Sequence, residues 1–205
     1  MRLLIRLILL LVAVLAGYAL WPRTPHPTQF EPAVVAQLET LAWKSAQNAT
    51  SLNGTVALYR IYDFQYGLPP RTAVSLSQNT IRSLNIFRTA PDVMDREKAL
   101  PLLLENLSAL KHATKAGFDA DAAARQLFTV WTLALQPTPP NALSKAVASY
   151  WAILYGKPAS AFTGAANAYA DALLANGFVP GSTADWPRVE TSLTKAYGQL
   201  AATLK

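Results

Sequence analysis

The segment from residue 59 to residue 71, YRIYDFQYGLPPR, holds the side chains best suited to bind another molecule. It contains several aromatic rings and ends at Gly67 and the Pro69-Pro70 pair. Tyrosine and arginine are enriched at the energetic centres of protein interfaces, and a Gly-Pro-Pro turn would hold such a surface rigidly. The sequence therefore predicts a partner-binding surface formed by Tyr59, Arg60, Tyr62, Asp63, Phe64, Tyr66 and Arg71.

Two other interpretations of these rings stay open. They could cover the end of a helical bundle, with the phenol hydroxyls reaching water at the rim. They could also stack on a sugar ring or lie at the depth of lipid head groups.

Groups that carry catalysis or bind metals are scarce. The chain has no cysteine and two histidines, and His112 stands beside Lys111 at a predicted helix end without a nucleophile motif nearby. The aspartate pairs at 92 and 95 and at 119 and 121 flank predicted helix starts, where carboxylates cap backbone amides. We therefore expect no catalytic residue, no cofactor and no metal, and we expect that the protein is not an enzyme.

The first 22 residues predict a transmembrane signal-anchor. Arg2 and Arg6 precede an uncharged apolar run that ends at Trp21, and Arg23 follows it. An indole and flanking cations are typical of membrane interfaces, so Arg6, Trp21 and Arg23 are the predicted membrane-interface residues. The positive charges predict that the rest of the chain lies on the periplasmic or extracytoplasmic side. A cleaved signal peptide is the alternative.

Residues 23–32 are rich in proline and predict a semi-rigid tether, and residues 33–205 form the predicted domain. The chain carries a net charge of +6, but the cations beyond the anchor are scattered among carboxylates. A nucleic-acid-binding protein gathers its cations on one face, so we expect no nucleic-acid partner.

Apolar residues recur with helical spacing almost everywhere after Pro32. This period predicts about six helices, near residues 33–48, 95–117, 121–135, 141–155, 159–176 and 185–204. Gly54 is expected to end the segment after the first helix, and Glu39 is expected to lie off that helix's apolar side. The predicted fold class is all-α: a transmembrane helix followed by a single helical bundle or a short stack of helical pairs.

These features favour a membrane-anchored, non-catalytic accessory or scaffold protein of a membrane or envelope complex. Its partners would be protein subunits of that complex and, through residues 1–22, the lipid bilayer. One alternative is a helical carrier whose apolar interior encloses an amphipathic small molecule, with lining residues Trp131, Tyr150, Trp151 and Phe162. Another is an envelope enzyme that acts on glycan or peptide through Asp63 with Arg60 or Arg71.

Overall fold

The computed structural model describes residues 23–48, 51–90, 92–178 and 182–205, together with residues 5, 7, 8, 10–12, 17 and 18. These residues form α-helices and no strand, which confirms the all-α prediction. The helices are α2 (Pro32–Gln47), α3 (Ser51–Arg60), α4 (Pro70–Thr89), α5 (Val93–Arg96), α6 (Leu100–Thr114), α7 (Ala120–Ala134), α8 (Pro140–Tyr155), α9 (Thr163–Ala175) and α10 (Trp186–Leu204).

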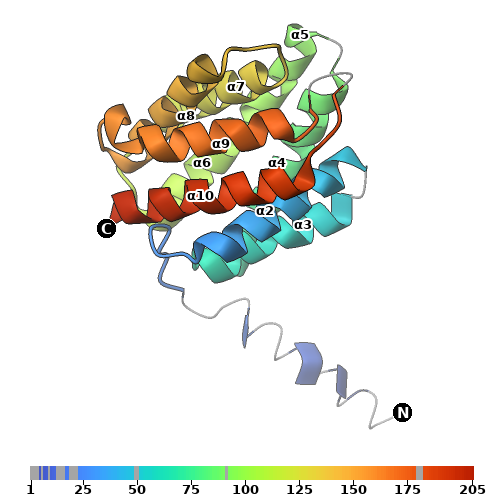
Figure 1. Ribbon diagram of the computed structural model, residues 1–205. Coiled ribbons are helices and arrows are strands. Elements are labelled where there is room, and N and C mark those ends of the chain that lie inside the picture. The colour runs from blue at the N-terminus through green and yellow to red at the C-terminus, as the bar shows by residue number, and fades with distance from the viewer. Residues whose placement is uncertain are drawn as a thin grey trace.

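The longer helices pack in chain order into a closed ring (Figure 1). Each of α2, α3, α4, α6, α7, α8, α9 and α10 packs against the next, and α10 returns to pack against α2. The first and last helices of the domain are therefore neighbours, and the ring encloses a common interior. We call this arrangement the helical ring.

The described residues contain nine α-helices where the sequence predicted about six. Gly54 does not end a helix; it lies within α3. A Cβ there would come 2.7 Å from Ile81 Cδ1, so glycine lets α3 approach α4 closely. The 20-residue helix α4 was missed because polar residues (Ser77, Asn79 and Ser83) are buried among its apolar ones and dilute the periodic pattern.

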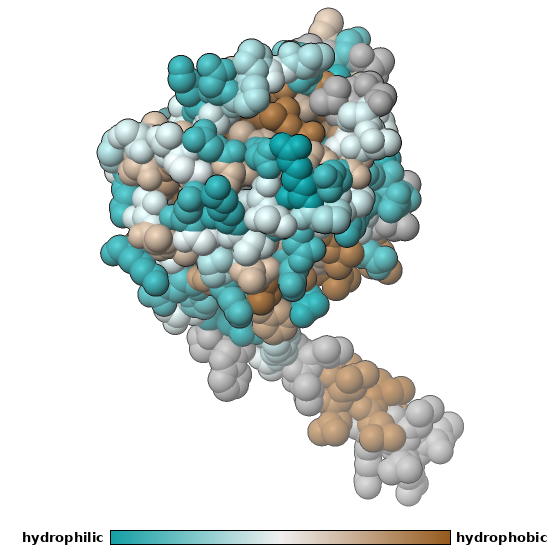
Figure 2. Space-filling model, in the orientation of Figure 1, coloured by the Kyte–Doolittle hydropathy of each residue, from teal (hydrophilic) through white to brown (hydrophobic). Residues whose placement is uncertain are grey.

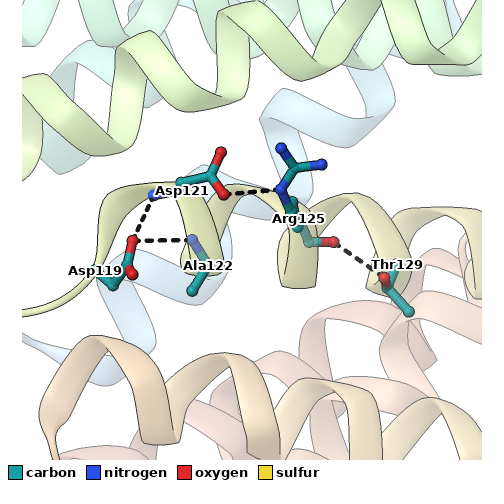
Figure 3. Close-up of polar contacts among 5 residues, drawn as sticks. All are labelled: Asp119, Asp121, Ala122, Arg125 and Thr129. Carbon is teal, nitrogen blue, oxygen red and sulfur yellow. Dashed lines mark hydrogen bonds and ion pairs between the residues drawn. The ribbon is translucent and has the colours of Figure 1, made fainter.

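Aspartates cap two of the predicted helices, as expected. Asp119 accepts hydrogen bonds from the backbone N–H groups of Asp121 (3.0 Å) and Ala122 (3.1 Å) at the start of α7 (Figure 3). Asp185 accepts one from Arg188 N at the start of α10, at 3.2 Å. These carboxylates therefore satisfy free amides of the first helical turn. Among the described residues, no group of His, Asp and Glu side chains could hold a metal ion.

The predicted anchor falls mainly on residues outside those described, and so do Arg6 and Trp21. In the part of the chain that the structure describes, no helix is long and apolar enough to cross a bilayer. The described apolar residues of this segment, such as Leu7 and Leu10, are exposed. Figure 2 shows brown, hydrophobic surface on the N-terminal segment outside the domain. The signal-anchor stays a prediction.

Candidate functional site

Residues 61–65 form one π-helical turn that continues α3. Tyr66 N donates to Ile61 O at 3.0 Å, five residues back, in the wider pattern that is often found at functional sites. The side chains of the predicted partner-binding surface point in different directions here. Tyr62 and Tyr66 line an internal cavity, whereas Tyr59 and Asp63 face the N-terminal segment.

Asp63 is the centre of a polar cluster that fixes the N-terminal segment to the domain. Its side chain is buried, and it accepts hydrogen bonds from the hydroxyls of Tyr59, at 3.0 Å, and Tyr18. Arg23 Nη2 lies 3.4 Å from Asp63 Oδ1, and the guanidinium lies over the Tyr18 ring, 5.0 Å from its centroid. Arg23, predicted to lie at the membrane interface, thus neutralises a buried carboxylate in this structure.

The rest of the predicted surface faces outward. Arg60 and Arg71 are exposed. Phe64 is 58% exposed and makes an edge-on contact with Tyr59, with ring centroids 6.4 Å apart. The structure therefore brings only part of the predicted set to one outer face.

The predicted tether packs on the helical ring. His26 N donates to Tyr66 O at 2.9 Å, and Phe30 meets Tyr66 edge-on with ring centroids 5.9 Å apart. Gly67 has a φ of +64°, and a Cβ there would come 2.8 Å from the His26 ring. Only glycine suits this turn, because a side chain would be strained and would displace the tether.

A cavity of about 700 Å³ lies inside the helical ring, and every helix of the ring contributes to its wall. Its wall has two chemically different parts. The first is rich in phenol rings and contains Tyr62, Tyr66, Tyr150, Tyr155, Tyr169 and Tyr197. The second is aliphatic and contains Leu103, Leu107, Leu110, Leu127, Ile153 and Leu154. We call them the tyrosine end and the leucine end; they belong largely to separate apolar clusters of the core.

Glu39, on α2, lies at the tyrosine end. Tyr169 donates a hydrogen bond to Oε1 at 2.7 Å, and Tyr197 donates one to Oε2. The residue is partly buried and lines the cavity. Burial raises the Glu39 pKa to about 6, although the two tyrosine hydrogen bonds oppose this rise. At neutral pH the carboxylate is therefore mostly ionised inside the protein.

No cation of the described chain balances this charge. The ion pairs among the described residues join Asp63, Asp95, Asp121 and Asp171 to Arg or Lys, and none involves Glu39. The described wall of the cavity holds no Lys, Arg or His, so Glu39 is the one ionisable carboxylate on it and lacks a partner of opposite charge.

The hydroxyls around Glu39 stay protonated. Burial raises the pKa of Tyr169 and Tyr197 well above the ordinary value, and the Glu39 charge raises both further. Burial also raises the pKa of Tyr66 well above the ordinary value, and Tyr155 and then the Glu39 charge raise it further. These tyrosines are thus hydrogen-bond donors throughout the physiological range.

A second polar group on the wall is incompletely bonded. Asn106 Nδ2 donates to Thr80 Oγ1 at 2.9 Å, and Thr80 Oγ1 also lies 3.2 Å from the Tyr62 hydroxyl. Asn106 is 8% exposed, and its Oδ1 accepts no hydrogen bond from any described residue. Most buried acceptors have a partner, and this oxygen lacks one within the described structure.

Comparison with known proteins finds no match: no family model, no curated protein and no solved structure resembles this chain significantly.

Sequence reasoning missed Glu39, and the expectation that it lies off the apolar side of its helix was wrong. Glu39 follows Val35 by four residues and precedes Trp43 by four, and both of these are buried. It therefore lies in the buried stripe of α2, whereas Leu41, expected on that side, is 43% exposed. A carboxylate within an apolar stripe was the signal that could have found this site.

Proposed function

We propose that this protein is a membrane-anchored helical binding protein that holds an amphipathic small molecule inside the helical ring. The observation that carries the proposal is the cavity of about 700 Å³ with a tyrosine end and a leucine end. This volume falls within the range of small-molecule sites, roughly 300 to 1,000 Å³. A fully packed core would have excluded such a function.

Three of the four interior residues suggested by the sequence line this cavity. Trp131, Tyr150 and Trp151 are on its wall, and Phe162 is buried in the core beside Trp151. The leucine end offers no polar partner for water along its aliphatic side chains, so a molecule with an apolar part fills it better than solvent does. A molecule with a polar group at one end matches both parts of the wall.

The N-terminal contacts bring the tyrosine end close to the predicted anchor. Pro27 and Thr28 border the cavity, and Phe30 packs on Tyr66 and Tyr197 at the tyrosine end. An anchor formed by residues 1–22 would therefore hold this end of the cavity close to the bilayer. Amphipathic molecules concentrate in bilayers, so the proposed ligand would be available there.

The test is to purify the full chain from its native membranes and to identify small molecules that remain bound, by native mass spectrometry. We expect a bound amphiphile in the unchanged protein and in Leu41→Trp, which adds bulk on the outer surface of α2. Leu107→Trp adds bulk at the buried leucine end, and we expect it to lose the molecule. Absence of any bound molecule, or equal retention by Leu107→Trp, would contradict the proposal.

A second proposal is that the protein also binds protein subunits of a membrane complex through the outer face of α3 and the π-turn. Phe64 is 58% exposed there, as are Leu52 (73%) and Val56 (50%) on α3. Contiguous exposed apolar side chains commonly mark interaction sites. Co-purification with Phe64→Ala tests this proposal: retention of every partner would contradict it.

A further inference from the structure

Glu39 is a charged group without a counter-ion on the wall of a cavity that is otherwise neutral. We propose that the ligand is a cationic amphiphile, with a protonated amine that pairs with Glu39 at the tyrosine end and an apolar part that occupies the leucine end. This inference rests on the proposed function, because it names the chemical class of the molecule in the same cavity.

The geometry of Glu39 leaves room for such a group. A carboxylate has about four lone-pair positions, two on each oxygen. Tyr169 occupies one position on Oε1, and Tyr197 occupies one on Oε2. Each oxygen therefore keeps a free acceptor position, and the side chain faces the cavity. An ammonium group supplies N–H donors for both oxygens.

The negative charge of Glu39 favours a cationic ligand over an anionic one. An ionised carboxylate inside a protein is unfavourable unless a positive charge or further hydrogen bonds compensate it. The described wall contains no cation, so the compensating charge has to come from a bound molecule. An anionic amphiphile would instead meet like charge at Glu39, and it would find no Lys, Arg or His on this wall.

The aromatic rings at the tyrosine end also favour a cationic ligand. Phenol and indole rings surround the tyrosine end, including Trp43 and Trp151 beside Tyr169. The faces of such rings attract cations, and the attraction strengthens where water is excluded. Tyr169 and Tyr197 already direct their hydroxyl protons to Glu39, so their hydroxyl oxygens can only accept hydrogen bonds from a ligand, which also favours a donor such as an ammonium group.

The free acceptor positions of Glu39 indicate which kind of cation fits. Tyr169 and Tyr197 each occupy one position, so each carboxylate oxygen can accept a further hydrogen bond. A ligand that fills these positions needs hydrogen-bond donors. A primary or secondary amine carries N–H groups, whereas a quaternary ammonium has none. The site therefore suits an amine with N–H donors better than a choline-like head group.

The experiment compares three probes that each carry a phenyl ring at the end of a four-carbon chain: 4-phenylbutylamine, 4-phenylbutanol and 4-phenylbutanoate. Binding to the full chain in phosphatidylcholine nanodiscs is measured by calorimetry near neutral pH, with empty nanodiscs as the blank. The variant is Glu39→Gln, which keeps the shape of the side chain and removes its charge. Glu105→Gln, at an exposed site on α6 away from the cavity, is the matched control.

We expect the amine to bind about tenfold more tightly than the alcohol, and the carboxylate to bind most weakly. Glu39→Gln should lose this preference and leave the affinity for the alcohol within about threefold, and Glu105→Gln should change neither. If the alcohol binds as tightly as the amine, or Glu39→Gln keeps the amine preference, the inference is wrong while small-molecule binding stands. If none of the three probes binds, both the inference and the proposed function fail.

Discussion

Asp63, which is buried, and Glu39, which is partly buried, are two carboxylates with similar partners and different surroundings. Each accepts hydrogen bonds from two tyrosine hydroxyls, Tyr59 and Tyr18 for Asp63, and Tyr169 and Tyr197 for Glu39. Asp63 also has a cation, Arg23, supplied by the N-terminal segment. Glu39 has no cation among the described residues and borders a cavity.

The difference separates a structural site from a binding site. The chain itself supplies the counter-ion of Asp63, and this ion pair fastens the tether to the domain, although Asp63 Oδ1 and Arg23 Nε make no hydrogen bond within the described structure. Glu39 has no such counter-ion among the described residues. A charge inside a protein that lacks a counter-ion costs stability and is kept where function requires it.

Removal of the Asp63 carboxylate should have the largest effect. Asp63→Ala leaves Arg23 without its partner and removes the acceptor that the Tyr59 and Tyr18 hydroxyls share, so we expect a loss on the order of 3 kcal/mol in the free energy of unfolding. Residues 23–31 should also become sensitive to protease. Urea unfolding and limited proteolysis of the full chain measure both effects.

The control for Asp63→Ala is Asp121→Ala, which removes the exposed ion pair with Arg125 seen in Figure 3. Exposed pairs contribute little, so this variant should unfold almost like the unchanged protein. Equal losses from the two variants would contradict the structural role of Asp63.

Glu39→Gln should stabilise the fold, whereas Asp63→Ala should destabilise it. The folded-state pKa of Glu39, about 6, lies above the ordinary value of 4.5. The stability linked to its proton is therefore present below pH 4.5 and is lost as pH rises through about 6. A shift of this size corresponds to about 2 kcal/mol, so the variant should be more stable than the unchanged protein by about that amount near neutral pH.

The stability gain of Glu39→Gln should fade as pH falls from about 6 towards 4.5. Urea unfolding of both proteins across this interval gives the measurement. A difference in stability that does not vary with pH would show that the charge of Glu39 is not the cause.

Tyr169→Phe should have a smaller effect, and it should change the pKa of Glu39. The Tyr169 hydrogen bond stabilises the ionised carboxylate and lowers its pKa, so its loss should raise the Glu39 pKa above about 6. Carbon NMR titration of the Glu39 carboxyl group measures this change. Tyr155→Phe is the control, because Tyr155 lines the cavity and makes no hydrogen bond to Glu39 that the structure shows. The same rise in both variants would contradict the assigned hydrogen bond.

Phe64→Ala should have the smallest effect on the fold. Its ring is 58% exposed, so we expect a change in the free energy of unfolding of about 0.5 kcal/mol or less. Tyr66→Ala is the contrasting variant, since Tyr66 packs on Phe30 and lines the cavity. Thermal unfolding compares them, and a larger loss from Phe64→Ala would contradict the orientation of the two rings.

Much of the second half of the fold could be predicted from sequence. Helices α7 and α10 begin at the aspartate caps and carry regular apolar stripes, and the sequence placed both near their observed positions. Helix α3 was missed because Gly54 was interpreted as a stop, although it serves close packing. The residues around a glycine in the sequence do not show whether it ends a helix or allows close packing, because close packing depends on a neighbour from another helix.

The candidate site was harder to predict, because its parts are distant along the chain. Tyr169 and Tyr197 lie 130 and 158 residues after Glu39 and reach it only once α10 packs against α2. The ring-rich segment at 59–66 was recognised by composition. Which of its rings face the cavity depends on the π-turn and on the packing of the tether against Tyr66, and the sequence indicates neither of these.

The most direct test of a missing counter-ion at Glu39 is the pKa of its carboxyl group with and without a saturating amine. Carbon NMR of the full chain should give a value of about 6 without ligand. With saturating 4-phenylbutylamine, a cation beside the carboxylate should lower this pKa clearly, whereas 4-phenylbutanol should not lower it to the same extent. An unchanged pKa at saturation with the amine would contradict the account, because the bound cation would then not lie at Glu39.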